Sequence, residues 1–300
     1  MADDEASATP DAPAGPPVCP RHPDRPSYVR CQRCGRPACP ECQRQAAVGV
    51  QCVDCVKQAA KQAPRVTTTL GGEVRTGRPV VTFTIIGACL VSFLLQLVPG
   101  LGWTERWLFW PEGGAIEPWR FLTVAFLHST GMLLHIAFNM YALYITGQFL
   151  EPLLGRARFG ALCALSAVGG SVGFLLFAGV SGPLGVSWMQ GTVGASGMVF
   201  GLFGAMLPVL RRMGRSAGQI VVLLVINGVL GFVVPNIAWQ AHLGGLVTGL
   251  ALGAAFAFAP RRSQRVIGVV APAAVLLVLV LAAVAKYQLA LAPVLTPGQV

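Results

Sequence analysis

Long apolar runs separated by short polar segments occupy most of the chain after its first quarter. Seven runs come close to the length that a helix needs to cross a bilayer, which is about 20 residues. They cover residues 80–99, 131–150, 159–180, 193–210, 219–235, 239–259 and 266–289. We therefore predict an all-α polytopic membrane protein with seven spanning helices.

The segments between the runs alternate between basic and uncharged. Those at 179–192 and 234–238 carry no charge. The basic ones precede the first run or follow the second, fourth and sixth, with Arg75, Arg78, Arg156, Arg158, Arg211, Arg212, Arg215, Arg261, Arg262 and Arg265. By the positive-inside rule this predicts a multi-pass protein of the cell membrane with a cytoplasmic N-terminus and an extracytoplasmic C-terminus. Only the long segment 100–120, which holds both signs of charge and four tryptophans, departs from the pattern. Its tryptophans favour the outer membrane interface.

Composition agrees with this interpretation. Hydrophobic residues make up 54% of the 300 residues and charged residues 11%, against about 25% charged in soluble domains. The net charge of +10 could suggest nucleic-acid binding, but the arginines gather at the ends of the apolar runs and in the N-terminal fifth. We expect the lipid bilayer as a partner and no nucleic acid.

Changes in composition divide the chain into five parts. Residues 1–18 lack bulky apolar groups and should be disordered. A cysteine-rich module at 19–58 and a polar linker at 59–78 follow. The core of six helices spans 79–260, and a seventh helix with a C-terminal tail spans 261–300.

The module contains eight soft metal ligands in four pairs, each pair separated by two residues. They are Cys19 and His22, Cys31 and Cys34, Cys39 and Cys42, and Cys52 and Cys55. That spacing presents both members of a pair to one tetrahedral ion. A disulfide framework is the alternative, but the preceding residues carry no export signal and the paired spacing fits metal better. We predict two structural Zn²⁺ ions that hold the module together.

Polar side chains inside apolar runs are costly and need a reason. Four such residues, His135, Asn139, Ser196 and His242, lie about 18–28 Å from the nearest cytoplasmic charge if a helix rises about 1.5 Å per residue. Their similar height predicts a shared, hydrated cavity in the outer half of the bilayer. His128 is expected at the membrane interface.

Ser196 lies in a glycine-rich run, where a lone serine is usually a packing residue. A glycine stripe next to Ser196 and another after His242 would let their helices approach closely, as a serine–histidine hydrogen bond requires. The stripes are Gly197, Gly201 and Gly204, and Gly245, Gly249 and Gly253. His135 and Asn139, four residues apart, could donate hydrogen bonds to an oxyanion.

The acidic residues narrow the chemistry. No aspartate follows Asp54, and Glu151 is the only acid after Glu117. An intramembrane aspartyl protease and a Ser-His-Asp triad are therefore excluded, so serine catalysis would use a dyad. Phe200, one turn after Ser196, is placed either to stack on the imidazole or simply to pack between helices.

At this point the sequence resembles the rhomboid family of intramembrane serine proteases over about residues 79–260. The matching elements, in the family's order, are Trp119-Arg120, His135-x-x-x-Asn139, Glu151-x-x-x-Gly155-x-x-Arg158, Gly194-Ala195-Ser196-Gly197 and Ala241-His242-x-x-Gly245-x-x-x-Gly249. The N-terminal module resembles a B-box-type zinc finger. In a cross-braced arrangement Cys19, His22, Cys39 and Cys42 would share one ion, and the other four cysteines the second, although the spacing alone leaves this pairing open.

The family resemblance implies a rhomboid-like six-helix core, with Ser196 as nucleophile and His242 as general base and then acid. It implies an oxyanion hole formed by the Ser196 N–H, His135 and Asn139, with no cofactor needed for catalysis. Structural roles fall to Trp119 and Arg120 in the first outer loop, to Glu151 and Arg158 in a cytoplasmic cap, and to Phe200, Gly245 and Gly249. Many members have tyrosine in place of Phe200.

Three functions are weighed against one another. The first is a serine endopeptidase that cuts transmembrane segments of other proteins near the outer leaflet. The second is an inactive rhomboid-like protein that binds membrane helices, against which the presence of both Ser196 and His242 argues. The third is a transporter, for which the apolar runs offer no acidic coupling site. The zinc module is expected to recruit a cytoplasmic protein partner.

Overall fold

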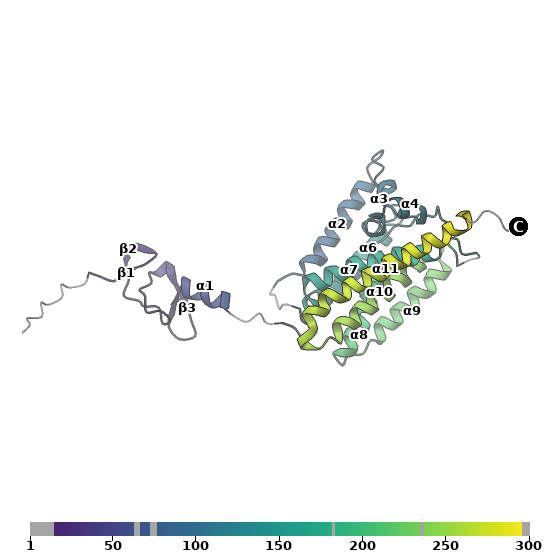
Figure 1. Ribbon diagram of the computed structural model, residues 1–300. Helices are drawn as coiled ribbons and strands as arrows, with labels where there is room; N and C mark the ends of the chain where they lie inside the picture. Colours follow the sequence, from purple (N-terminus) through teal and green to yellow (C-terminus); the bar gives the residue numbers. More distant parts are fainter. Residues whose placement is uncertain (1–14, 63–66, 73–76, 182–183, 235–236, 296–300) are drawn as a thin grey trace, which may run out of the picture. The chain divides into compact units, whose positions relative to one another are not determined.

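The computed structural model describes residues 15–62, 67–72, 77–181, 184–234 and 237–295 (Figure 1). The chain divides into two compact units, residues 1–65 and 66–300, and each is described by itself. Most of the tail predicted to be disordered, together with parts of the linker and the C-terminal tail, lies outside the described residues. Residues 15–18 are described, and Val18 already belongs to a strand.

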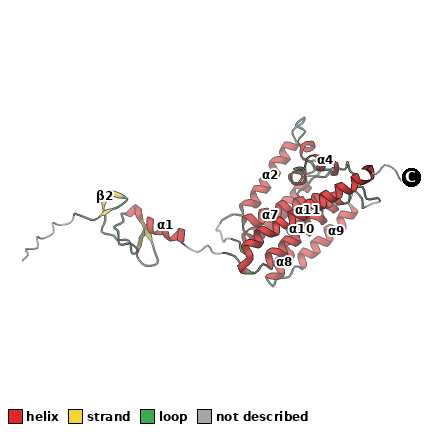
Figure 2. Cartoon of the chain, viewed as in Figure 1, coloured by secondary structure: helices red, strands yellow, loops and turns green. Residues whose placement is uncertain are grey.

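The N-terminal unit contains two small antiparallel sheets and one α-helix (Figure 2). Strands β1 (Val18–Cys19) and β2 (His22–Pro26) form the first sheet, and β3 (Gln43–Gln45) and β4 (Val50–Cys52) form the second. The short helix η1 (Pro40–Cys42) precedes β3, and α1 (Val53–Gln62) ends the unit. Its buried core consists of six cysteines with Ala38 and Val53. The unit therefore has very little apolar core apart from its cysteines.

The second unit is a bundle of long helices, as predicted. Each long helix overlaps one predicted apolar run: α2 (Val80–Gln96), α6 (Leu133–Leu154), α7 (Arg156–Leu176), α8 (Ser196–Arg212), α9 (Gly218–Val233), α10 (Trp239–Ala257) and α11 (Gln264–Leu295). By length and composition three helical stretches could cross a membrane, namely α7, α10 and residues 261–290, while α2 and α9 are shorter apolar helices.

Short helices connect some of the long ones. The segment between α2 and α6 contains α3 (Trp103–Trp107), α4 (Pro111–Ile116), α5 (Arg120–Thr123) and η2 (Val124–Phe126). The helix η3 (Arg261–Ser263) leads into α11. The tryptophan-rich segment 100–120, whose secondary structure was not predicted from the sequence, is therefore largely helical.

Helices α8 and α10 pack with almost no side chain between them. A methyl group added to Gly245 would lie 1.9 Å from the backbone oxygen of Gly197, and one added to Gly249 would lie 1.8 Å from that of Gly201. Such distances are far below contact, so only glycine fits at these crossings. The close approach predicted from the two glycine stripes is confirmed.

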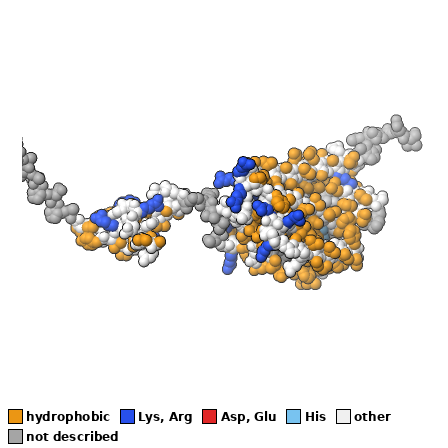
Figure 3. Space-filling view, turned by 90° about the horizontal axis from the view of Figure 1, so that it is seen from below, with side chains coloured by type: hydrophobic (Ala, Val, Ile, Leu, Met, Phe, Trp, Pro, Cys, Tyr) orange, Lys and Arg blue, Asp and Glu red, His pale blue; other side chains and the backbone are white. Residues whose placement is uncertain are grey.

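The visible face of the helical unit is largely apolar, and most of its Lys and Arg side chains gather at one end (Figure 3). Exposed apolar side chains such as Val225 (60%) and Phe232 (64%) would be unfavourable in water but suit lipid. The helix ends agree, since α7 begins at Arg156 and α8 ends at Arg212. Apolar helices of this kind belong to a membrane protein.

Residues 67–72 have structure of their own, although they lie in the segment predicted as a plain linker. Leu70 is only 1% exposed and joins the main hydrophobic core. The Thr68 hydroxyl donates a hydrogen bond to the backbone oxygen of Leu153 at 2.6 Å. One apolar side chain and a few backbone hydrogen bonds are too small a signal to stand out in a polar stretch.

Candidate active site and candidate metal clusters

Ser196 is the first residue of α8, where the chain turns from an outer loop into the bundle. Gly194, two residues earlier, has φ +141°, in the region that favours glycine. A methyl group added to Gly194 would lie 3.0 Å from Nε2 of His135 and 3.5 Å from Oγ of Ser196. The His135 ring and the Ser196 hydroxyl therefore face the same small space beside Gly194.

His242 lies in the first turn of α10, and its ring stacks on Phe200 of α8. The ring centroids are 4.2 Å apart and the planes differ by 9°. Of the two roles considered for Phe200, stacking is the one observed. Within the described residues, Ser196 and His242 are not hydrogen-bonded to each other. Hydrogen bonds between catalytic groups are often long without substrate and tighten when it binds.

His135 and Asn139 lie on the first two turns of α6. The backbone N–H of Ser129 donates to Nδ1 of His135 at 3.2 Å. A neutral ring that accepts at Nδ1 carries its hydrogen on Nε2, so the nitrogen facing Gly194 is the donor. The Asn139 side chain is buried, and its Nδ2 donates to the backbone oxygen of His135 at 2.7 Å. One of its two amide hydrogens is thereby used within α6.

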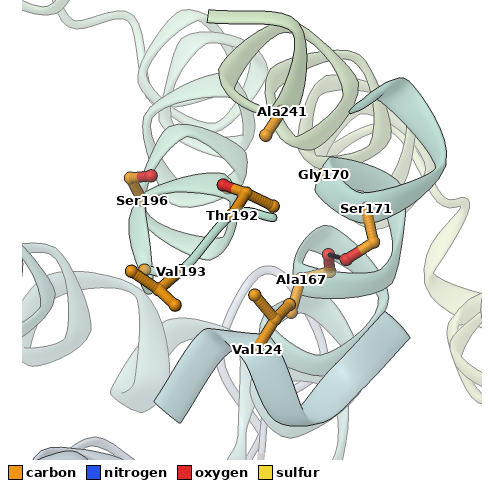
Figure 4. A pocket seen from close by; sticks show the side chains of 10 residues that line it. Val124, Ala167, Gly170, Ser171, Thr192, Val193, Ser196 and Ala241 are labelled. Carbon is orange, nitrogen blue, oxygen red and sulfur yellow. Dashed lines mark hydrogen bonds between the residues drawn. The ribbon is translucent and has the colours of Figure 1, made fainter. Parts of the chain in front are cut away.

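A cavity of about 20 Å³ opens next to Ser196 (Figure 4). That is room for one water molecule. It is lined by Val124, Ala167, Gly170, Ser171, Thr192, Val193, Gly194, Ser196, Gly197 and Ala241. Of the four polar residues expected to share a hydrated cavity, only Ser196 lines this one. Thr192 and Ser171, which do line it, were not singled out from the sequence.

His128 is 1% exposed, so its side chain is buried within the helical unit, and its expected position at the depth of the membrane interface stays a prediction. Its ring lies 5.4 Å from that of His135. The Gln96 side chain fixes the backbone of His128. It accepts a hydrogen bond from the His128 backbone N–H at 2.9 Å and donates one to the His128 backbone oxygen at 3.0 Å. A glutamine 32 residues earlier in the chain gives no local signal of this contact.

Arg120 organises the first outer loop. Its Nη1 donates to the backbone oxygens of Glu105 and Leu108 at 3.0 and 2.8 Å, and its Nε to the Glu117 carboxylate at 2.5 Å. The guanidinium also lies over the Trp110 ring, 4.3 Å from its centroid. Trp119, by contrast, is 49% exposed. Trp110 is thus a partner of Arg120 that the motif did not indicate.

Glu151 and Arg158 have separate partners near the ends of α6 and α7. The Glu151 carboxylate accepts the backbone N–H groups of Val81 and Thr82, both at 2.9 Å, and the Thr82 hydroxyl at 2.7 Å. It thereby caps the N-terminus of α2. Arg158 donates to the backbone oxygens of Leu70 and, at 2.5 Å, Gln264. It joins residues 67–72 to the start of α11.

The eight cysteine and histidine ligands of the N-terminal unit form two clusters. One contains Cys19, His22, Cys39 and Cys42, and the other contains Cys31, Cys34, Cys52 and Cys55. Within each cluster the ligand atoms all lie within 4.8 Å of one another. This is the grouping of the cross-braced arrangement, which the spacing alone left open. Both clusters could bind a metal ion.

The donor atoms have the spacing of a tetrahedral site. Bonds of about 2.3 Å from Zn²⁺ to sulfur put the ligands about 3.8 Å apart. Cys34 and Cys52 have their sulfurs 3.8 Å apart, and Nδ1 of His22 lies 3.2 and 3.4 Å from the sulfurs of Cys39 and Cys42. A hydrogen bond from the backbone of Cys39 helps lower the pKa of Cys19 to about 6, which favours the thiolate. The donor set and spacing fit a tetrahedral metal site.

Comparison with known proteins finds a match to the family model described as the rhomboid domain over residues 115–259. The chain is 32% identical over 195 residues to the rhomboid protease GluP of Bacillus subtilis, which covers 60% of this chain and 36% of that protein. It is 36% identical over 160 residues to the RHOMBOID-like protein 5 of Arabidopsis thaliana, covering 51% of this chain and 47% of the relative.

A third relative is the rhomboid protease GlpG of Yersinia enterocolitica, 31% identical over 180 residues, with 57% of this chain and 60% of the relative covered. The chain thus spans less than two thirds of the length of each of these relatives. The likeness falls on the helical unit.

Proposed function

The chain belongs to the rhomboid family, and from this we propose that it is an intramembrane serine endopeptidase that cleaves transmembrane segments of other proteins near the outer leaflet. The observation that carries the proposal is the convergence of three helices around Gly194 and Ser196. Helix α8 begins with Ser196, and the His135 ring of α6 faces the Ser196 hydroxyl across Gly194. His242 of α10 stacks on Phe200, one turn after Ser196 on α8. Relatives named as proteases support the same activity.

In the proposed reaction the Ser196 oxygen attacks the carbonyl carbon of the scissile peptide and His242 takes the hydroxyl proton. His242 then protonates the leaving amine, and a water attacks the acyl-enzyme in the second half of the cycle. The water-sized cavity beside Ser196 is suited to supply it. Glu151, the one acid after Glu117, is hydrogen-bonded to the start of α2, and His242 stacks on Phe200, so we propose that Phe200 rather than a carboxylate orients the imidazole.

The oxyanion would be stabilised by the Ser196 N–H and by Nε2–H of His135. The hydrogen bond from Ser129 to Nδ1 of His135 supports this role, because it leaves the donor nitrogen facing Ser196. The N-terminus of α8 adds a positive dipole end at the same point. Asn139 is proposed as the third donor through its second amide hydrogen, while its first holds the α6 backbone.

We propose a cytoplasmic N-terminus and an extracytoplasmic C-terminus. The arginines at the start of α7, the end of α8 and the start of α11 support this orientation. Ser196 lies at the end of α8 opposite Arg212, and His135 and His242 lie near the starts of α6 and α10, whose far ends lead to the arginines of α7 and η3. Water would therefore enter from outside. Arg120 would hold the first outer loop in place, while Glu151 and Arg158 would tie down the cytoplasmic ends.

Each ligand cluster of the N-terminal unit is proposed to bind one structural Zn²⁺. The tetrahedral spacing of the donors supports it. We propose that the folded module recruits a cytoplasmic partner of the protease.

The experiment compares wild type, Ser196→Ala and His242→Ala in liposomes that contain a reporter with one transmembrane helix. Wild type should cleave the reporter and react with a fluorophosphonate probe, and both variants should lose cleavage. Ser187→Ala, which removes an exposed serine of the outer loop, is the matched control and should retain both. A wild type that binds the reporter but neither cleaves it nor takes up the probe would instead identify an inactive helix-binding protein.

A further inference from the structure

Two outer segments near Ser196 are hydrogen-bonded to each other. The Thr192 N–H donates to the backbone oxygen of Phe109 at 2.8 Å, and the Glu112 N–H donates to that of Trp188 at 3.2 Å. Residues 109–112 and 188–192 therefore lie side by side, and the second of them leads through Gly194 into Ser196. A contact that fixes residues 109–112 therefore also fixes residues 188–192, the segment that leads into Ser196.

The far end of α11 makes such a contact. The Tyr287 hydroxyl donates to the backbone oxygen of Pro111 at 2.7 Å. Its ring lies 6.1 Å from that of Trp188, and the ammonium of Lys286 lies 5.9 Å from the same indole. Gly114 leaves room for this, since a methyl group there would lie 2.9 Å from the Tyr287 oxygen. One residue of α11 thus touches both outer segments.

The opposite end of α11 is also fixed. The Gln264 side chain donates to the backbone oxygen of Thr69 at 2.8 Å, and the backbone oxygen of Gln264 accepts from Arg158. Between the two ends, α11 packs along α7 and α10 (Figure 1). Ala271 and Val275 rest on the main core, while Ala283 and Tyr287 rest on the outer cluster around Phe109. The height of Tyr287 in the bundle is therefore set at both ends of the helix.

We propose that α11, which lies outside the matched rhomboid domain, is a positioning element of the active site, and that Tyr287 holds the loop that places Ser196. The inference rests on the proposed protease function. Misplacing a reacting group by about 1 Å can lower the rate about 100-fold. A remote hydrogen bond that fixes the position of the loop before Ser196 can therefore change kcat. If α11 served only for membrane anchoring, Tyr287 would affect stability alone.

The test uses the full-length protein in liposomes with Tyr287→Phe, which keeps the ring, and Tyr287→Ala, which removes it. Tyr141→Phe, on the exposed face of α6, is the control for losing a tyrosine hydroxyl. We expect Tyr287→Phe to lower kcat about fivefold, as for one lost hydrogen bond, with KM nearly unchanged. Tyr287→Ala should lower kcat about 10- to 100-fold. The rate of fluorophosphonate labelling should fall in parallel, and Tyr141→Phe should match wild type.

A readout without catalysis accompanies the kinetics, namely amide hydrogen exchange at residues 188–195. Exchange there should speed up in Tyr287→Phe and stay unchanged in Tyr141→Phe. A Tyr287→Phe protein with a lower Tm but unchanged kcat, labelling and exchange would overturn the inference. If wild type proves inactive while exchange responds as expected, the proposed function fails and the positioning contact stands. If wild type is active and Tyr287→Phe equals it, only this inference fails.

Discussion

Each of the two units of this chain is stabilised internally in a different way. The N-terminal unit buries six cysteines with only two apolar residues, and its strands are two to five residues long. The helical unit buries leucines, phenylalanines and glycines, and its tightest contact is backbone on backbone between α8 and α10. We expect the first unit to depend on bound metal, since its two ligand clusters could each hold an ion, whereas the second depends on the absence of side-chain atoms between α8 and α10.

This difference determines where each unit is vulnerable. If metal holds the first unit, a chelator should unfold it and leave the second unit intact. A methyl group added to Gly245 or Gly249 would push α10 away from α8 in the helical unit and leave the N-terminal unit intact. The site around Ser196 needs the second kind of precision, because His242 reaches Phe200 only if the helices meet at glycine.

The largest effect should come from removing metal. Structural zinc supplies on the order of 10 kcal/mol of folding free energy in small modules, so chelation or Cys39→Ser should unfold the N-terminal unit. The measurement is the loss of dispersed amide resonances from residues 18–62. Serine in place of Cys163, a buried cysteine of α7 outside both clusters, is the control and should leave these resonances unchanged. A module that stays folded without metal would contradict the comparison.

Gly249→Ala should destabilise the helical unit by about 3 kcal/mol, because its methyl group meets the Gly201 backbone, which has no room to move. The measurement is Tm in detergent together with cleavage. Gly228→Ala on α9 is a close match, since a methyl group there has nothing within 4 Å. It should be neutral or slightly stabilising. Equal shifts in both variants would show that glycine packing is not what holds α8 to α10.

Glu151→Gln should cost about 2 kcal/mol. The buried carboxylate accepts three hydrogen bonds at the start of α2, and an uncharged amide accepts more weakly and brings a donor with no partner there. Unfolding of the helical unit in graded denaturant would measure the loss. Glu112→Gln, on the exposed side of α4, should change little. A Glu151→Gln protein as stable as the Glu112 variant would argue against the cap.

The smallest effect concerns the stack on His242. Phe200→Leu keeps an apolar side chain but loses ring stacking worth about 1 kcal/mol, so kcat should fall about fivefold. Phe200→Tyr keeps the ring and should retain most of the activity. If leucine performs as well as phenylalanine, packing rather than stacking orients the imidazole.

Much of the fold could be predicted because the signals are local. All seven apolar runs correspond to long helices, and spacings of three and four identified the glycine faces that meet. The pattern of one helix shows which residues share a face, but not what covers it. That is why the contacts of Tyr287 with Pro111 and of His128 with Gln96 could not be anticipated.

The same limit applies to the ligand clusters and to residues 67–72. Four equally spaced pairs are compatible with more than one grouping, and only the folded chain brings Cys39 and Cys42 to His22. Residues 67–72 look polar, yet the Leu70 side chain lies in the core and hydrogen bonds to Leu153, Arg158 and Gln264 hold the segment in place. At the candidate active site, the identities of Ser196 and His242 were predicted from motifs, and their roles stay predictions.

The central claim is that Ser196 is the nucleophile of a protease, and covalent labelling tests it most directly. Full-length protein in liposomes is treated with a fluorophosphonate probe and the modified peptide is identified by mass spectrometry. We expect a single adduct on Ser196 in the wild type and in Ser187→Ala, both of which should cleave the reporter. Ser196→Ala should lose both the adduct and the cleavage. Undiminished cleavage by Ser196→Ala, or an adduct on another serine, would contradict it.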